Sequence, residues 1–339
     1  MGGATEPADG LTDAQLVGQR IVVGFEGRRP SGDLERRIRR GRVAGVILFD
    51  DNFSSRADAR TVVRRLQSIP RPEELDSPLL VMVDQEGGLV KRLPGPPSMS
   101  AEQMGRAGPP ACRRQGKATG RSLAGTGVNV DLAPVLDVGR PGSAMAREHR
   151  SFGASAGAVW RCGGAFGEGL ERPDVGVTAK HFPGIGSARV NTDFQVQRLR
   201  ISKRRLRRTD EVPFERFARS GSPRRLVMIS SAIYPAFSAR PASFTREIAT
   251  KELRDRLGFD GVSVSDALDT ASTRRFGGTA KVAREVAGAG TDLLLYTEPG
   301  DGARAARALR GALRRDEIPR SSFLASAERV LGLRESLGK

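Results

Sequence analysis

The sequence predicts an α/β fold, a single (β/α)8 TIM barrel. Three observations lead to it: a length of 339 residues, eight short apolar runs rich in β-branched residues, and charged stretches of helical period between those runs. Strands that alternate with helices run parallel and are joined by crossovers. Eight such units in about this length favour a closed barrel over an open doubly wound sheet.

The predicted strands are the apolar runs of the chain. They lie at residues 21–25, 43–49, 79–83, 128–132, 175–179, 226–229, 262–264 and 292–296. Predicted helices separate them, and the clearest are residues 57–67, 154–170 and 248–257. No glycine-rich dinucleotide fingerprint follows any of these strands in the sequence, which argues against a Rossmann fold. We expect one barrel domain over residues 1–339, with a flexible segment at residues 1–12.

The net charge of +17 comes almost wholly from arginine. Such a basic field attracts nucleic acid, anionic lipid or an acidic polymer such as cell-wall glycan. The arginines of segments 36–42, 204–208 and 304–315 recur at helical spacing, however, as they do on the solvated faces of amphipathic helices. The sequence contains no recognisable nucleic-acid module. We therefore expect no nucleic-acid partner, and salt-sensitive duplex binding would be the signature of that rival function.

Cysteine and histidine are scarce in this chain. The two cysteines, Cys112 and Cys162, and the two histidines, His149 and His181, do not have the spacing of a zinc site, so we expect no metal. The sequence leaves open whether the cysteines form a disulfide. It contains no run of about 18 apolar residues, which excludes a membrane span. Because a signal peptide is not evident, we expect a cytoplasmic monomer from the chain as given, and a secreted protein if a signal peptide has been removed.

Polar residues cluster where the predicted strands end. They are Asp84, Gln85, Glu86, Asp137, Lys180, His181, Ser230, Ser231, Ser265 and Asp266. In barrels of this kind the loops after the strands converge on one mouth, which carries the active site. Several strands thus deliver ionisable groups to one place, and we expect a catalytic or binding site there.

Six motifs at these strand ends carry a resemblance to a known family. They are GVILFDDN (45–52), VDQEGGLVKRL (83–93), NVDLAPVLDV (129–138), RSFG (150–153), AKHFPG (179–184) and LGFDGVSVSDALD (257–269). In order and spacing they resemble family 3 glycoside hydrolases. The chain ends shortly after the eighth predicted helix, and in this it is similar to the single-domain β-N-acetylglucosaminidase (β-hexosaminidase) branch. The resemblance implies a retaining β-glycosidase for N-acetylglucosamine-containing saccharides derived from peptidoglycan or chitin, without metal or organic cofactor.

The resemblance assigns the nucleophile to Asp266, which follows the seventh predicted strand. A carboxylate at the top of a barrel strand can form a covalent glycosyl-enzyme and thereby split one difficult displacement into two easier ones. The alternative is that Asp266 caps the next helix.

The family's sugar-binding positions match five further residues. They are Asp84, Arg92, Arg150, Lys180 and His181. Carboxylates and cationic groups accept from and donate to vicinal hydroxyls, and polar groups left unpaired penalise the wrong ligand. The alternatives are a turn carboxylate for Asp84, a surface pair with Glu148 for Arg150, and a buried core histidine for His181.

The acid/base loop departs from the family pattern. That pattern reads Lys-His-Phe-Pro-Gly-His-Gly, four residues, then Asp-Ser-His, whereas this chain has Ile185 at the first loop histidine and Asn-Thr-Asp at 191–193. Ser231 stands where a further histidine is expected. Asp193 is then the candidate acid/base, provided that burial raises its pKa. Three interpretations remain: a hydrolase using Asp193, an enzyme of another glycosidic specificity, and a glycan-binding pseudoenzyme. Sugar transfer to phosphate instead of water is a further variant.

Overall fold

The computed structural model describes residues 8–338, in which eight parallel strands form a ring. The strands are β1 (Ile21–Val23), β2 (Gly45–Ile47), β3 (Leu80–Val83), β6 (Val130–Asp131), β7 (Gly176–Phe182), β8 (Arg225–Ile229), β9 (Val262–Ser265) and β10 (Leu294–Tyr296). They pair in chain order, and β1 also pairs with β10. A parallel bridge between Val264 and Leu293 links β9 to β10. The predicted closed barrel is confirmed.

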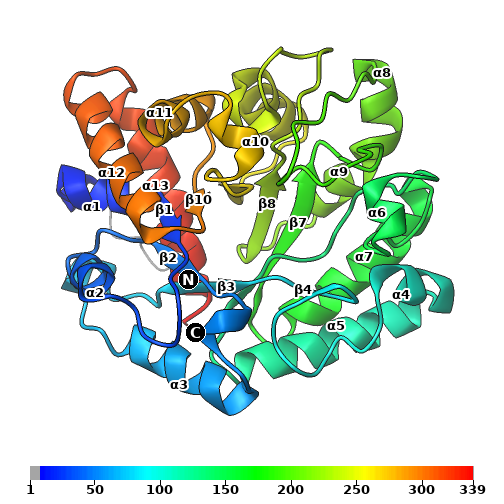
Figure 1. The fold of residues 1–339 in the computed structure, drawn as a ribbon, viewed down its shortest axis with the longest axis horizontal. Coiled ribbons are helices and arrows are strands. Elements are labelled where there is room, and N and C mark those ends of the chain that lie inside the picture. The colour runs from blue at the N-terminus through cyan, green and yellow to red at the C-terminus, as the bar shows by residue number, and fades with distance from the viewer. Residues whose placement is uncertain (1–7, 339) are drawn as a thin grey trace.

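Helices surround the strands (Figure 1). The α-helices are α1 (Asp13–Gly18), α2 (Gly32–Arg39), α3 (Arg56–Gln67), α4 (Ala101–Ala107), α5 (Pro109–Ala124), α6 (Ala144–Arg147), α7 (Ala156–Glu171), α8 (Lys203–Arg205), α9 (Val212–Ala218), α10 (Ala271–Arg274), α11 (Thr279–Ala289), α12 (Pro299–Arg314) and α13 (Arg320–Ser336). Two π-helices, η4 (Leu206–Asp210) and η6 (Glu247–Arg256), and four 3₁₀ turns, η1 (Ala8–Gly10), η2 (Asp50–Asn52), η3 (Glu73–Leu75) and η5 (Ala242–Phe244), complete them. Within the described residues no helix has the length and apolar character that a membrane crossing requires.

Several helices begin at a serine for a local reason. The hydroxyls of Ser31, Ser55 and Ser155 accept hydrogen bonds from the backbone N–H three residues later, at the starts of α2, α3 and α7. This satisfies a donor that the first helical turn would otherwise leave without a partner. The prediction of a flexible segment at 1–12 falls partly on residues 1–7, which lie outside the described residues. Within its remainder, η1 packs Ala8 into the core.

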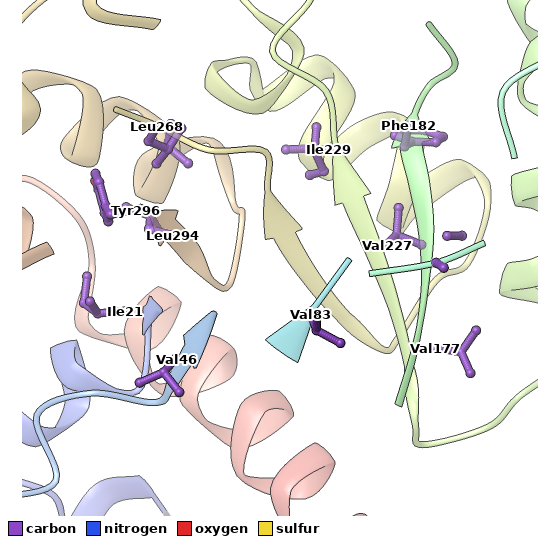
Figure 2. Packing of buried hydrophobic residues seen from close by; sticks show 14 of the residues in the cluster. Ile21, Val46, Val83, Val177, Phe182, Val227, Ile229, Leu268, Leu294 and Tyr296 are labelled. Atoms are coloured by element: carbon purple, nitrogen blue, oxygen red, sulfur yellow. The ribbon is translucent and has the colours of Figure 1, made fainter. Parts of the chain in front are cut away.

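The strands alternate between two apolar layers. Val46, Val83 and Leu294 belong to the layer that also contains the helix residues (Figure 2), so these side chains point out of the barrel toward the helices. Their neighbours Ile47 and Met82 belong to a separate cluster made almost entirely of strand residues, which fills the barrel interior. The period of two along each strand thus builds both layers.

Helix α13 covers the amino-terminal end of the barrel. Its Val330 and Leu333 join the interior cluster. The guanidinium of Arg334, which is 1% exposed, donates to the carbonyl oxygens of Leu75, Ser77 and Pro78 at 2.5–3.0 Å, in the segment that leads into β3. This end is therefore sealed by packing and by hydrogen bonds to backbone, and the site must open at the other end.

Helices α5 and α7 lie against each other with backbone almost in contact. A Cβ at Gly116 would lie 2.1 Å from the carbonyl oxygen of Phe166, so only glycine fits there. Beside this contact Cys112 and Cys162 form a disulfide with Cα atoms 5.5 Å apart. The structure thus pairs the two cysteines that the sequence left open.

Candidate active site

A cavity of about 210 Å³ opens where the strands end, and all seven predicted site residues line it. They are Asp84, Arg92, Arg150, Lys180, His181, Asp193 and Asp266. Its apolar lining includes Ile47, Leu132, Met228 and Leu295, which also belong to the barrel interior. The cavity therefore lies directly on the uppermost layer of that interior, and residues from loops far apart in the chain meet above it.

Lys180 is the centre of a buried ionic network. Its Nζ lies 2.6 Å from Asp84 Oδ1 and 2.6 Å from Glu86 Oε1, and the side chain is 2% exposed. Burial alone would lower the pKa of Lys180, but Asp84 and Glu86 outweigh it and hold the pKa above its ordinary value. The ammonium is therefore charged, and it fixes the Asp84 carboxylate at the cavity wall.

Arg150 holds Glu86 from the other side. Its Nε and Nη2 each donate to a Glu86 oxygen at 2.9 Å, and Nη1 donates to Glu148 at 3.2 Å. Arg150 is buried and Glu148 is half-buried, so their pairing is not one between two exposed surface side chains. Burial works against ionisation of Glu86, but Arg150 and Lys180 prevail and lower its pKa to about 2. Bidentate pairing of this kind fixes geometry as well as charge.

His181 is oriented by a carboxylate beneath the site. Its Nδ1 lies 2.7 Å from Asp137 Oδ2, and the backbone N–H of Ile185 donates to Asp137 Oδ1 at 2.6 Å. With Nδ1 as the donor to Asp137, the Nε2 atom is left for the cavity. Strand β7 continues past its predicted end at residue 179 and includes Lys180 and His181. These polar side chains can be buried in the strand because each has a charged partner at the mouth of the barrel.

Asp266 follows the last residue of β9. Its backbone N–H donates to the carbonyl oxygen of Ile229 at 3.0 Å, and its Oδ1 accepts from the backbone N–H of Ala267 at 2.9 Å. The next helix, α10, is capped by Thr270, which accepts from the N–H of Thr273. Asp266 is thus not the cap of that helix, and the carboxylate lines the cavity.

Asp193 lies on the long loop between β7 and α8. Its backbone N–H donates to the side chain of Asn191 at 2.9 Å, and its carboxyl lines the same cavity as Asp266. Burial raises its pKa to about 6, and the charge of Asp266 adds to this, whereas His181 and Arg150 act in the opposite direction. Asp193 is therefore protonated in mildly acidic solution, which a proton donor requires.

Arg92 stands on the other wall, after the short antiparallel hairpin of β4 (Gln85–Gly87) and β5 (Val90–Lys91). Its guanidinium is 4.0 Å from Asp84 Oδ2 and 3.8 Å from Asp50 Oδ2, and it lies over the ring of Phe49. These distances are longer than direct hydrogen bonds. Arg92 is thus less tightly held than Arg150 and has donors available to a ligand.

The mouth is bordered by exposed apolar side chains. Leu89, at the tip of the hairpin, is 72% exposed, and Phe194, next to Asp193, is 77% exposed. Val190, close by on the same loop, is 38% exposed. Within residues 8–338 these are the exposed large hydrophobic residues, and each is adjacent in sequence to a residue that lines the cavity.

Sequence reasoning assigned no role to two residues that organise the site. Glu86 joins Lys180 to Arg150, and Asp137 orients His181. Both had been placed among the polar groups at strand ends, and that position was the available signal. Ile185 stands at the position of a family histidine. It is buried, and its backbone N–H donates to Asp137. Ser231 is also buried.

Comparison with known proteins places this barrel in a family. Residues 13–333 match the glycosyl hydrolase family 3 N-terminal domain. An uncharacterized secreted glycosyl hydrolase of Arthroderma benhamiae is 34% identical over 98% of this chain and 96% of its own length. A beta-hexosaminidase of Alkalilimnicola ehrlichii is 32% identical over 81% of this chain and 79% of its own.

A solved structure agrees with these relatives. The family 3 beta-N-acetylglucosaminidase of Paenibacillus sp. FPU-7 superposes with a TM-score of 0.90 and 30% identity over 96% of this chain. This chain spans 63% of that protein. The protein described here belongs to glycosyl hydrolase family 3, and it is a glycoside hydrolase.

Proposed function

We propose that the protein is a retaining exo-β-N-acetylglucosaminidase that acts on peptidoglycan- or chitin-derived saccharides through a covalent intermediate on Asp266. The observation that carries the proposal is the pairing of two unlike carboxyls in one cavity. Asp266 lies beside charged groups and accepts a backbone hydrogen bond, while Asp193 has its pKa raised to about 6. A carboxyl whose pKa is raised by burial suits an acid, and a second carboxylate in the same cavity can serve as the nucleophile.

In the first step an oxygen of Asp266 bonds to the anomeric carbon while the bond to the leaving oxygen breaks. Asp193 gives its proton to that oxygen, so the departing sugar leaves as a neutral alcohol. In the second step the Asp193 carboxylate takes a proton from water, whose oxygen attacks the anomeric carbon and releases Asp266. Both carboxyls return to their starting states, and two inversions retain the β configuration.

The ionic network suits the binding of a sugar. Asp84 can accept from ring hydroxyls because Lys180 holds it in place, and Arg92 and Arg150 can donate to them. His181 lines the same cavity, and with its Nδ1 on Asp137 its Nε2 is left for a ligand. In this proposal Glu86 and Asp137 act as positioning residues, because their oxygens are taken by Arg150, Lys180 and His181.

The size of the cavity supports cleavage from the end of a chain. At about 210 Å³ it is smaller than the roughly 300–1,000 Å³ pockets of drug-sized ligands, and it suits a single sugar ring. The names of the hexosaminidase and N-acetylglucosaminidase relatives support N-acetylglucosamine as that sugar.

A second candidate is a glycan-binding pseudoenzyme. It is favoured by Ile185 and Ser231, which replace family histidines with buried side chains that do not titrate. A panel of nitrophenyl β-glycosides that differ only in the sugar separates the two, because only an enzyme releases the phenol. We expect the N-acetylglucosaminide to be cleaved fastest. Binding of N-acetylglucosamine without phenol release from any of them would favour the pseudoenzyme. Repeating the assay with added phosphate decides between water and phosphate as acceptor.

A further inference from the structure

A second cavity lies on the outer ring of helices, away from the strand ends. It has a volume of about 260 Å³ and is lined by α1, α2, α12 and the residue Arg42. Its apolar lining consists of small side chains of α1 and α12, and its charged lining comprises Arg37, Arg42, Arg307, Arg310 and Asp33. We call it the arginine groove. It shares no residue with the cavity at the mouth of the barrel.

The positive charge of the arginine groove has almost no partner on the protein. In the part of the chain that the structure describes, none of its four arginines forms a salt bridge. Asp33, the acid in the lining, is itself 3.0 Å from Arg36. Arginines of the site cavity differ in this respect, since Arg150 is held by two carboxylates. The groove therefore gathers four like charges, which Asp33 in its lining offsets only in part.

Arg37 shows the lack of acceptors most clearly. Its Nη1 donates to the carbonyl oxygen of Pro299 at 3.2 Å, but its Nη2 is buried and has no partner among residues 8–338. Burial lowers the pKa of Arg37. Asp33 has a smaller, opposite effect, and Arg307 lowers the pKa further. A buried guanidinium nitrogen without an acceptor costs free energy that a bound oxyanion would recover.

We propose that the arginine groove binds a phosphate group carried by a small organic molecule. Guanidinium groups recognise phosphate oxygens through paired, charge-assisted hydrogen bonds, and four of them can hold a dianion from several sides. The small apolar residues between α1 and α12 then contact the uncharged part of the ligand. The groove is a binding site separate from the hydrolytic site.

The test uses inorganic phosphate and phenyl phosphate as probes, titrated into the purified protein by calorimetry at constant ionic strength. We expect saturable binding at one site, with phenyl phosphate several-fold tighter because its ring contacts the small apolar residues of the lining. Arg37→Gln and, separately, the exposed Arg307→Gln should each weaken binding about tenfold, as expected for a lost charge-assisted hydrogen bond. Arg307→Gln keeps the test valid if Arg37→Gln fails to fold.

The matched control is Arg39→Gln, an exposed arginine of the same helix that does not line the groove. It removes the same charge and should leave the dissociation constant within about twofold of the wild-type value, since an exposed distant charge is screened by salt. Equal weakening by Arg39→Gln would reduce the effect to net charge and overturn the proposal. Absence of saturable binding would overturn it as well. Weakening by Arg92→Gln but not by the groove variants would place the phosphate at the mouth, with the same consequence.

Discussion

The two ends of the barrel both bury charged side chains, and Arg334 and Arg20 at the closed end differ from Lys180 and Arg150 at the open end in their partners. At the amino-terminal end, Arg334 and Arg20 donate mainly to backbone carbonyl oxygens of the segments around them. At the carboxyl-terminal end, Lys180 and Arg150 are held by side-chain carboxylates, and Asp84 among these also faces the cavity. Backbone acceptors are fixed by the fold, whereas a side-chain carboxylate can share its oxygens with a ligand.

This difference indicates that the two groups of charges have different roles. Arg334 and Arg20, held by backbone at the closed end, stabilise the ring, whereas Lys180 and Arg150, held by carboxylates at the open end, prepare a surface for a sugar. Substitutions at the closed end should therefore change stability and spare turnover. Substitutions at the open end should do the reverse.

The largest effect is expected for Asp266→Ala at the open end. Because the covalent step needs its carboxylate, turnover of a nitrophenyl N-acetylglucosaminide should fall by about 10³-fold or more. The melting temperature should remain close to the wild-type value, since Asp266 caps no helix. Retention of more than about a tenth of the wild-type rate would remove Asp266 from the role of nucleophile.

The next effect is on stability, at the closed end. Arg334→Met should keep the bulk of the side chain but leave the carbonyl oxygens of Leu75, Ser77 and Pro78 without their donor. We expect the free energy of unfolding, measured by urea titration, to fall by about 3–5 kcal/mol. The rate per folded molecule should be unchanged. Arg39→Met, at an exposed position on α2, is the control and should change stability by less than about 0.5 kcal/mol.

Asp193→Ala should separate substrates by their leaving group. A dinitrophenolate leaves readily without a proton, whereas a sugar alkoxide does not, so the need for an acid depends on the substrate. Cleavage of a disaccharide should slow by about 10²-fold or more, and formation of the glycosyl-enzyme from a dinitrophenyl glycoside by much less. Equal slowing of both, or of neither, would exclude Asp193 as the acid and favour the pseudoenzyme or an acid supplied from elsewhere.

Asp84→Ala should reduce both binding and turnover, because its hydrogen bonds to sugar hydroxyls strengthen as the ring distorts. It also takes one counter-charge from buried Lys180. We expect kcat/KM to fall by about 10- to 100-fold, as for the loss of hydrogen bonds to charged groups. Unchanged affinity for N-acetylglucosamine in calorimetry, together with unchanged kinetics, would make Asp84 a turn residue only.

The smallest effect is the pH dependence of the wild-type enzyme. The pKa of Asp193 is raised to about 6 and its protonated form is the donor. Disaccharide cleavage should therefore be lost as pH rises through that value, by about tenfold for each further unit. Glycosyl-enzyme formation from the dinitrophenyl glycoside should stay nearly flat over the same range. Parallel profiles for both substrates would contradict this assignment.

The fold could be predicted from the sequence because its evidence is local. Each strand of the ring is a short apolar run, and the polar residues that follow it mark the mouth. The end of β7 was missed because Lys180 and His181 are polar, and only partners from other strands make their burial favourable. The sequence did not reveal the roles of Glu86 and Asp137 for the same reason: their partners lie on other strands and loops. Pairing across distant segments also decides the disulfide, which residue counts alone do not reveal.

The seam between β1 and β10 sets the order in which the barrel can be made. As the protein is synthesised, β1 leaves the ribosome long before β10, and it must wait with one edge unpaired. Helix α13, which fills the interior with Val330 and Leu333, emerges later still. Until residues 294–296 are free, the nascent chain is an open sheet in which β1 has an exposed edge of the kind that promotes aggregation. Closure of the ring is thus a late step of synthesis, and dependence on chaperones should be greatest for chains that stall just before β10.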